Sequence, residues 1–159
     1  MTQSCEQRIR MPILIHTVEF NSPAYKTMCA LRYDVLRKPI GMELREKDVA
    51  QDHMEFHIGA FDEGKMIGCV LLRPLSETTV KLRQMAVADS YQGQGIGVKL
   101  VQFAEWLAVE EKFSSIEVNA RKTAQGFYEK LGYAPTGASF IEVKQHTLKM
   151  AKQLKPDRV

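Results

Sequence analysis

The chain has 159 residues, of which 45% are hydrophobic and 26% charged, and its formal net charge at pH 7 is +3. This length suits one domain with a single core, and the composition is ordinary for a soluble globular protein. No long run of Lys and Arg concentrates the small positive charge, so a nucleic-acid partner is not indicated. No window approaches the ~18 apolar residues of a membrane helix, and the start does not resemble a signal peptide. We therefore expect no membrane partner either.

The cysteines are Cys5, Cys29 and Cys69, an odd number without a CxxC pair or a zinc-binding spacing. This pattern predicts reduced thiols and a cytoplasmic location, with Cys29 and Cys69 acting as small buried hydrophobic residues. The polar ends predict a flexible tail at 1–11 and another at 152–159, on either side of one domain at 12–151.

The N-terminal third predicts a strand followed by two helices. "ILIHTVEF" (13–20) alternates in polarity, as a half-buried strand does. The next letters, "NSP", supply a helix N-cap and a first-turn proline. They predict a helix over 24–38 that ends near Pro39, and "ELREKDVAQ" (43–51) predicts a short second helix.

The middle of the chain predicts an antiparallel meander of three strands joined by short turns. The first turn, "DEGK", contains Gly64, which suits a hairpin. The strands are expected at 54–61, 66–75 and 80–87.

The C-terminal half predicts helices that alternate with strands. A helix over 96–111 leads to a strand at 114–120, which should pair in parallel with 80–87 because a helix connects them. "KTAQGFYEKLGY" predicts a short helix closed by Gly132, and 139–150 reads as one last strand. The order predicts a mixed α/β sheet with helices on both faces.

Three glycines lie in Gln92–Gly97, "QGQGIG", between the third meander strand and the long helix. Glycines before a helix let backbone N–H groups reach a phosphate, which the partial positive charge of the helix start also attracts. A Walker A loop needs GK[ST], but Lys99 is followed by Leu100. The GxGxG spacing also fits poorly to the dinucleotide fingerprint GxGxxG, so NAD or FAD is the less favoured ligand.

The motif resembles the Q/R-x-x-G-x-G/A loop of the GNAT superfamily of N-acetyltransferases. "LRQMAV" before the loop and "VNARKTAQGFYEKLGY" after it are also similar to that family, and so is the element order. The resemblance covers roughly 13–150, and its specific part is about 80–135. "LRYDVLRKPIG" and "FIEVKQHTLKM" resemble the small ElaA-like bacterial members. The resemblance implies the GNAT fold, with a parallel pair of fourth and fifth strands that splay apart at the cofactor site.

The resemblance further implies direct transfer of an acetyl group from acetyl-CoA to a primary amine, with no metal. A small-molecule acceptor is favoured over a protein N-terminus or lysine, and a homodimer is an expectation from the same source. The alternative of another class is a catalytically silent acyl-CoA-binding module. The residues that match the family's cofactor-binding positions are Met85, Ala86, Val87, Gln92, Gly93, Gln94, Gly95, Ile96, Gly97, Asn119 and Phe127.

Tyr128 matches the position where many family members keep a tyrosine near the sulfur of CoA. A phenol can donate a proton to a leaving thiolate, so the resemblance implies that Tyr128 is the general acid. The structural alternative is that Tyr128 only packs its helix against the sheet.

The general base is left open by the sequence, because the fourth strand carries Lys81 and Arg83 where some members have a glutamate. A base must accept the proton of the attacking amine, and histidine and carboxylate side chains suit this role. A water chain is a further alternative. Two pairs are expected to share a strand face by their spacing of two or four residues: Glu55 with His57, and Glu142 with His146. We place Glu142 and His146 in the predicted catalytic set.

Two further clusters have a structural explanation that we favour. His53, Glu55 and His57 alternate as metal ligands on one strand face would, but no further ligands accompany them. A second cluster lies near the first helices, where a solvated face is expected and an anion-binding site for the acceptor is the alternative. Its residues are Arg32, Arg37 and Arg45.

Overall fold

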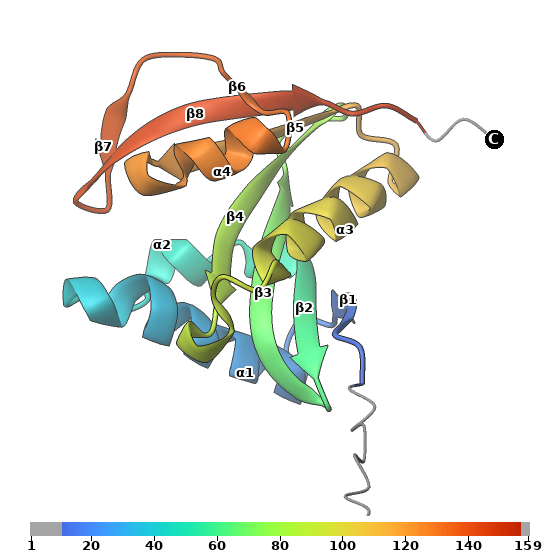
Figure 1. Ribbon diagram of the computed structural model, residues 1–159, viewed down its shortest axis with the longest axis vertical. Coiled ribbons are helices and arrows are strands. Elements are labelled where there is room, and N and C mark those ends of the chain that lie inside the picture. The colour runs from blue at the N-terminus through green and yellow to red at the C-terminus, as the bar shows by residue number, and fades with distance from the viewer. Residues whose placement is uncertain (1–10, 157–159) are drawn as a thin grey trace, which may run out of the picture.

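A computed structural model describes residues 11–156, and these form an eight-stranded sheet in the order β1-β2-β3-β4-β5-β8-β6, with β7 paired to β8 (Figure 1). No helix within this range is long and apolar enough to span a membrane. The helices are α1 (Pro23–Arg32), α2 (Glu46–Val49), α3 (Ile96–Glu110) and α4 (Gln125–Lys130). The strands are β1 (Leu14–Val18), β2 (Phe56–Asp62), β3 (Lys65–Pro74), β4 (Thr79–Val87), β5 (Ser115–Arg121), β6 (Ala134–Pro135), β7 (Phe140–Glu142) and β8 (Gln145–Gln153).

The expected meander and parallel crossover are both present. Strands β1 to β4 pair antiparallel in chain order, and β4 pairs in parallel with β5. The N-terminal tail expected at 1–11 lies outside the described residues except for Met11, and Cys5 lies there too. Cys29 is half-buried and Cys69 is buried, both as free thiols.

The first helix is shorter than expected and ends in two irregular turns. Ser22 is its N-cap, with the side-chain Oγ accepting a hydrogen bond from the N–H of Tyr25 at 3.2 Å. After α1 the chain continues as a π-helical turn over Tyr33–Arg37 and a 3₁₀ turn over Lys38–Ile40. Gly41, with a φ of 69°, ends this segment in the left-handed conformation.

The last strand was expected at 139–150, and this prediction is wrong: the segment is a hairpin of β7 and β8. Its turn residues are Val143 and Lys144, with φ values of 50° and 60°. Two-residue turns with positive φ normally use Asn or Gly, so Val-Lys carries no turn signal. Strand β8 also continues to Gln153, beyond the expected end.

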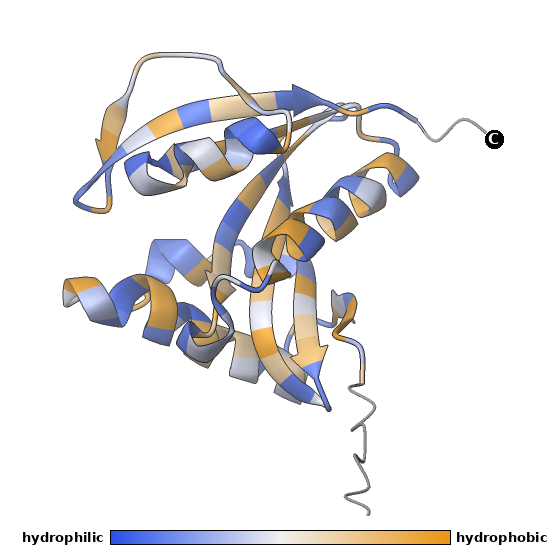
Figure 2. Cartoon of the chain, viewed as in Figure 1, coloured by the Kyte–Doolittle hydropathy of each residue, from blue (hydrophilic) through white to orange (hydrophobic). Residues whose placement is uncertain are grey.

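The core lies on the side of the sheet that α3 covers. Alternate residues of β4 and β5 point into it, together with the apolar stripe of α3. A second, smaller cluster packs α1 on the opposite face, against β3 and β4 (Figures 1 and 2). The α3-side residues of β4 and β5 are Val80, Leu82, Ile116, Val118 and Ala120.

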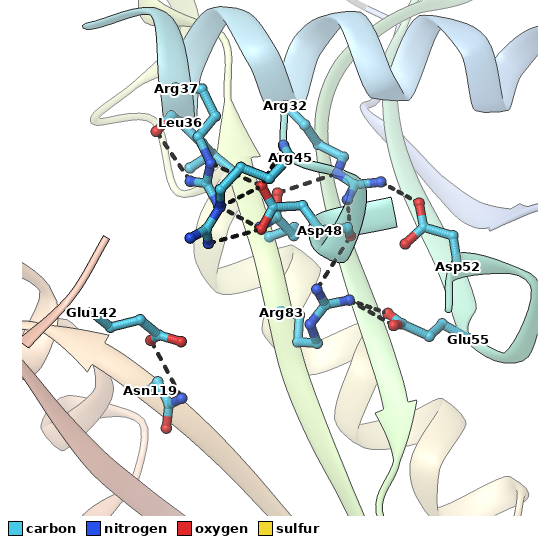
Figure 3. A network of polar contacts seen from close by, with 11 residues as sticks. Arg32, Leu36, Arg37, Arg45, Asp48, Asp52, Glu55, Arg83, Asn119 and Glu142 are labelled. Atoms are coloured by element: carbon cyan, nitrogen blue, oxygen red, sulfur yellow. Dashed lines mark hydrogen bonds and ion pairs between the residues drawn. The ribbon is translucent and has the colours of Figure 1, made fainter. Parts of the chain in front are cut away.

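Arg32 was expected on a solvated face, and this prediction is wrong because its side chain is fully buried. Its Nη1 donates to Oδ2 of Asp52 at 2.6 Å (Figure 3). Its Nε donates to Oε1 of Gln84 at 3.3 Å. The hydroxyl of Tyr25 donates to the same Asp52 oxygen at 2.6 Å. Helical periodicity could not reveal this burial, since the partners come from distant parts of the chain. The network joins α1 to the segment before β2 and to the middle of β4.

Candidate active site

Strands β4 and β5 separate halfway along their length. Their parallel pairing runs from Thr79↔Ser115 to Leu82↔Val118 and stops there. Just beyond, two residues of β4 face one residue of β3, which is a β-bulge, and Gln84 in this bulge has a φ of 52°. A cavity of about 570 Å³ lies where the strands diverge, lined by β4, β5, α4, β7, β8 and the segments around α2. The bulge thus leaves one edge of β4 without a partner strand beside a cavity.

The glycine loop lies next to this unpaired edge of β4. Gly93 and Gly95 have φ values of 76° and 80°, and a Cβ atom at either would meet open space. Gly95 is the N-cap of α3, so the first N–H groups of that helix have no intrahelical acceptor. The Nε2 of Gln92 fixes the loop by donating to the carbonyl of Val87 at 3.0 Å and to Asp89 at 3.2 Å. The loop therefore offers backbone donors and a helix N-terminus to an anion.

The other predicted cofactor-binding residues differ in what their side chains can reach. A Cβ on Gly97 would meet the ring of Phe127 at 3.4 Å, so Phe127 packs across the first turn of α3 and does not line the cavity. The side chains of Ala86 and Ile96 are buried in the two apolar clusters. Gln94 donates from its side chain to the carbonyl of Ser90. Ala86 and Ile96 can therefore serve a ligand only through backbone groups, whereas Met85, Val87, Gln92 and Asn119 are among the residues that line the cavity.

Tyr128 lies on α4, is 5% exposed and lines the cavity. Its ring makes edge contacts with Phe127 and Tyr133, so it also packs α4 against the core. Its hydroxyl has no hydrogen-bond partner among residues 11–156. Burial raises the pKa of Tyr128 to about 12, and the positive charge of Arg121 opposes this shift. The hydroxyl is therefore a proton donor at neutral pH and is free to serve a ligand.

Asn119 on β5 and Glu142 on β7 form a second polar group at the cavity. The Asn119 Nδ2 donates to Oε2 of Glu142 at 3.4 Å (Figure 3). The Oδ1 of Asn119 is buried and has no partner within the described residues. A buried acceptor without a donor is costly, so this atom is suited to bind an N–H or O–H group of a ligand.

The pairing of Glu142 with His146 on one strand is wrong, because the hairpin turn separates them. Glu142 lies on β7 opposite Gln145, and His146 lies on β8 opposite Ile141. Glu142 lines the cavity at its exposed rim. His146 is exposed and lies outside the cavity lining, whereas its neighbour Thr147 is buried in it. Since side chains alternate along a strand, His146 points away from the site.

The other pair of candidate bases is also separated from the cavity. Glu55 precedes β2, and its carboxylate accepts from Arg73 Nε at 2.8 Å and from Arg83 Nη1 at 2.6 Å. His57 is buried on β2, and burial lowers its pKa. His53, which completed the metal-ligand alternative, lies in a 3₁₀ turn, so the expected common strand face does not exist. Within residues 11–156, no group of three or more His, Cys, Asp or Glu is placed to hold a metal ion.

Asp48 was missed by the sequence analysis and forms one wall of the cavity. Its carboxylate accepts from Nη2 of Arg37 and from Nη2 of Arg45, both at 3.1 Å. Burial alone would raise the pKa of Asp48, but these hydrogen bonds prevail and hold it well below its usual value. Asp48 is therefore ionised, and its carboxylate already accepts hydrogen bonds from two arginines. Arg37 is buried and not solvated as expected. The three-residue spacing between Arg45, the N-cap of α2, and Asp48 within it was the one local sign of this contact.

The comparisons with known proteins agree with this geometry. A family model described as "Acetyltransferase (GNAT) domain" matches residues 53–135. The Bacillus subtilis protein "Uncharacterized N-acetyltransferase YitI" is 30% identical over 118 residues, which cover 69% of this chain and 78% of that protein. The fold and the site define an acyltransferase. The chain belongs to the GNAT acetyltransferase family.

Solved structures have the same fold. A structure from Lactobacillus plantarum that carries an N-acetyltransferase name is 26% identical, with a TM-score of 0.81 over 91% of this chain and 100% of that chain. An aminoglycoside 6′-N-acetyltransferase complexed with coenzyme A is 17% identical, with a TM-score of 0.75 over 92% of this chain and 99% of that chain. The narrower ElaA-like assignment stays a prediction.

Proposed function

We propose that the protein is an N-acetyltransferase that moves an acetyl group from acetyl-CoA directly to a primary amine of a small molecule. The observation that carries this proposal is the cavity between the diverging β4 and β5. It brings together three groups that have no partner within residues 11–156, namely the hydroxyl of Tyr128, the buried Oδ1 of Asn119 and the edge of β4 beyond Leu82. The glycine loop adjoins that edge.

The residues present fit acetyl-CoA. The backbone of Gln92 to Gly97 and the start of α3 would bind the pyrophosphate, and no side chain obstructs Gly93 or Gly95. Met85 to Val87 would bind the pantetheine amides through their free backbone edge, and Asn119 Oδ1 would accept a further N–H. When bound, acetyl-CoA supplies a thioester and a thiolate leaving group.

The chain's own groups have three tasks in the proposed reaction. A backbone N–H of β4 near Val87 would donate to the oxygen on which negative charge develops. Tyr128 would donate its proton to the departing sulfur, because its raised pKa keeps it protonated. Glu142, at the rim of the same cavity, would accept the proton that the amine loses, directly or through water.

Gly95→Glu is expected to lower the affinity for acetyl-CoA by at least about a hundredfold, because it places a carboxylate and bulk where the pyrophosphate would bind. A side chain at a φ of 80° also strains the backbone. Gly64→Glu is the matched control, since Gly64 has a φ of 81° and open surroundings in the β2–β3 turn. Calorimetric titration with acetyl-CoA separates the two effects. Equal losses in both variants would refute the loop assignment.

Glu142→Gln is expected to lower kcat/KM for the amine by about a hundredfold while acetyl-CoA affinity is retained, because the amide cannot accept the proton. Glu117→Gln is the control, since Glu117 lies on β5 outside the cavity lining. Steady-state rates over a range of pH measure both variants. A wild-type rate for Glu142→Gln would remove Glu142 from the mechanism and favour a water chain.

The overall function is tested by incubating the protein with acetyl-CoA and a panel of primary amines, while released thiol is measured. Amine-dependent thiol release is the expected result. Acetyl-CoA binding without release for small amines or for peptides with free N-termini and lysines would favour the silent acyl-CoA-binding module. Release with peptides alone would favour a protein acetyltransferase. Absence of acetyl-CoA binding would overturn the proposal.

A further inference from the structure

Two basic side chains of the cavity point away from the cofactor loop. Val80 and Leu82 of β4 pack on the α3 side, so Lys81 between them faces the opposite side of the sheet. Ala120 of β5 likewise packs on the α3 side, and Arg121 follows it. Both Lys81 and Arg121 line the cavity. They therefore lie on the sheet face opposite the helix whose N-terminus would bind the pyrophosphate.

The other basic residues of the cavity already have a carboxylate partner in the protein. Arg37 and Arg45 both pair with Asp48, as described above. Arg83 pairs with Glu55 at 2.6 Å. Neither Lys81 nor Arg121 makes a hydrogen bond or an ion pair within the part of the chain that the structure describes. These two are the cavity cations without a protein partner in residues 11–156.

Their surroundings favour a further anion. Both residues are half-buried, and burial lowers the pKa of each, which reflects the cost of holding a positive charge there without a partner. Glu142 is the acidic group that attracts both of them, and its carboxylate also contacts Asn119. One carboxylate against two cations leaves a positive charge in the cavity uncompensated.

We propose that the amine acceptor carries an anionic group, a carboxylate or a phosphate, which is bound by Arg121 and Lys81 in the cavity between β4 and β5. Arginine suits such a group because its planar guanidinium can donate two parallel hydrogen bonds to it. Glu142 on the same face then lies beside the amine end of the acceptor, in the role proposed above. This inference rests on the proposed function and specifies its substrate class.

The same charges disfavour acceptors with several ammonium groups. The cavity lining has five basic and two acidic residues. An aminoglycoside carries several ammonium groups, so the charge of this cavity disfavours it as an acceptor, although the fold is similar to that of an aminoglycoside acetyltransferase. The expected order of preference is anionic amines, then neutral amines, then polyamines.

The test compares matched acceptors in wild type and in Arg121→Gln. Each α-amino acid is paired with its amide, O-phosphoethanolamine is paired with ethanolamine, and spermidine represents the polyamines. Wild type is expected to acetylate one anionic class with a higher kcat/KM than its uncharged partner. Arg121→Gln is expected to raise KM for that anionic acceptor at least about tenfold, with little change for the uncharged partner or for acetyl-CoA. For each pair, the ratio of kcat/KM for the anionic acceptor to that for its uncharged partner is compared between wild type and Arg121→Gln. The different basicities of the two amines affect both enzymes alike and cancel in this comparison.

Lys149→Gln is the control for loss of one positive charge, because Lys149 lies on the same sheet face but is exposed and outside the cavity lining. If the loss in Arg121→Gln is seen with the amino acids and not with O-phosphoethanolamine, the anionic group is a carboxylate, and the reverse result indicates a phosphate. Equal or better use of the amides, of ethanolamine or of spermidine by wild type would overturn the inference about the anion, while acetyl transfer itself would still be shown.

If no amine releases thiol, the proposed function fails, and calorimetry of the same amines with the acetyl-CoA-bound protein then tests the anion site by itself. Binding of anionic amines that Arg121→Gln weakens would support the anion site, and no such binding would overturn it.

Discussion

Replacing Tyr128 with phenylalanine is expected to lower kcat by about a hundredfold or more, with little change in acetyl-CoA affinity. The substitution removes one hydroxyl that lines the cavity and has no partner in residues 11–156, and it keeps the ring that packs α4. General acid catalysis by a positioned side chain contributes ~10²- to 10⁴-fold in rate. Single-turnover measurement of thiol release isolates the chemical step from product release.

Tyr133→Phe is the matched control for this variant. Tyr133 is 3% exposed, and its buried hydroxyl has no hydrogen-bond partner among the described residues, but it lies outside the cavity lining. It should retain the wild-type kcat and lose no stability, since an unpartnered buried hydroxyl is removed. A wild-type rate for Tyr128→Phe would leave Tyr128 with its packing role alone.

The pH dependence of kcat gives an independent check on Tyr128. A general acid must be protonated, so the rate falls as pH rises through its pKa. Because the pKa of Tyr128 is raised to about 12, the hydroxyl stays protonated over the whole neutral range. Wild-type kcat should therefore show no loss that depends on Tyr128 between about pH 7 and about pH 10. A fall in that range that Tyr128→Phe abolishes would contradict the raised pKa.

The second large effect is expected on stability. Asp52→Leu should lower the free energy of unfolding by about 3–5 kcal/mol, because it leaves the charge of Arg32 buried without its carboxylate. Both side chains of this pair are 0% exposed. The substitution also removes the acceptor of the Tyr25 hydroxyl. Urea unfolding, with the midpoint and slope fitted together, measures the change.

Two further variants test whether the loss of stability in Asp52→Leu comes from a buried charge without its partner. Glu105→Gln breaks the pair with Lys152, whose side chain is 32% exposed, and should cost less than about 1 kcal/mol. Adding Arg32→Met to Asp52→Leu should recover much of the loss, because two apolar side chains replace an unpaired buried charge. A small effect of Asp52→Leu alone would mean that water reaches Arg32.

Local patterns in the sequence were sufficient to predict the secondary-structure elements around the glycine loop. The alternation of β4, the glycines of 92–97 and the apolar stripe of α3 are encoded within a few residues of one another. These elements and the parallel β4–β5 pair were predicted correctly. The positive φ of Gly93 and Gly95 also follows from residue type.

The acceptor side could not be predicted in the same way, because its contacts join distant segments. The burial of Arg32 depends on Asp52, and that of Arg37 on Asp48, and both aspartates lie outside the segment that carries the two arginines. The direction of His146 depends on a turn at Val143 and Lys144 that has no glycine or asparagine. The bulge at Gln84, which helps open the cavity, has no residue signature of its own.

The β7–β8 hairpin makes the acceptor wall a replaceable unit. Glu142 and Val143 line the cavity from the hairpin's first strand and turn, and Glu142 accepts a hydrogen bond at 3.4 Å from Asn119 on β5. The glycine loop and the start of α3 lie on other parts of the chain. Exchanging residues 140–145 with those of a relative should therefore change the rate with the acceptor through Glu142, and it should leave acetyl-CoA affinity and the anion preference set by Arg121 and Lys81 unchanged. A few substitutions confined to this hairpin would therefore reshape one wall of the cavity without altering the glycine loop or the start of α3.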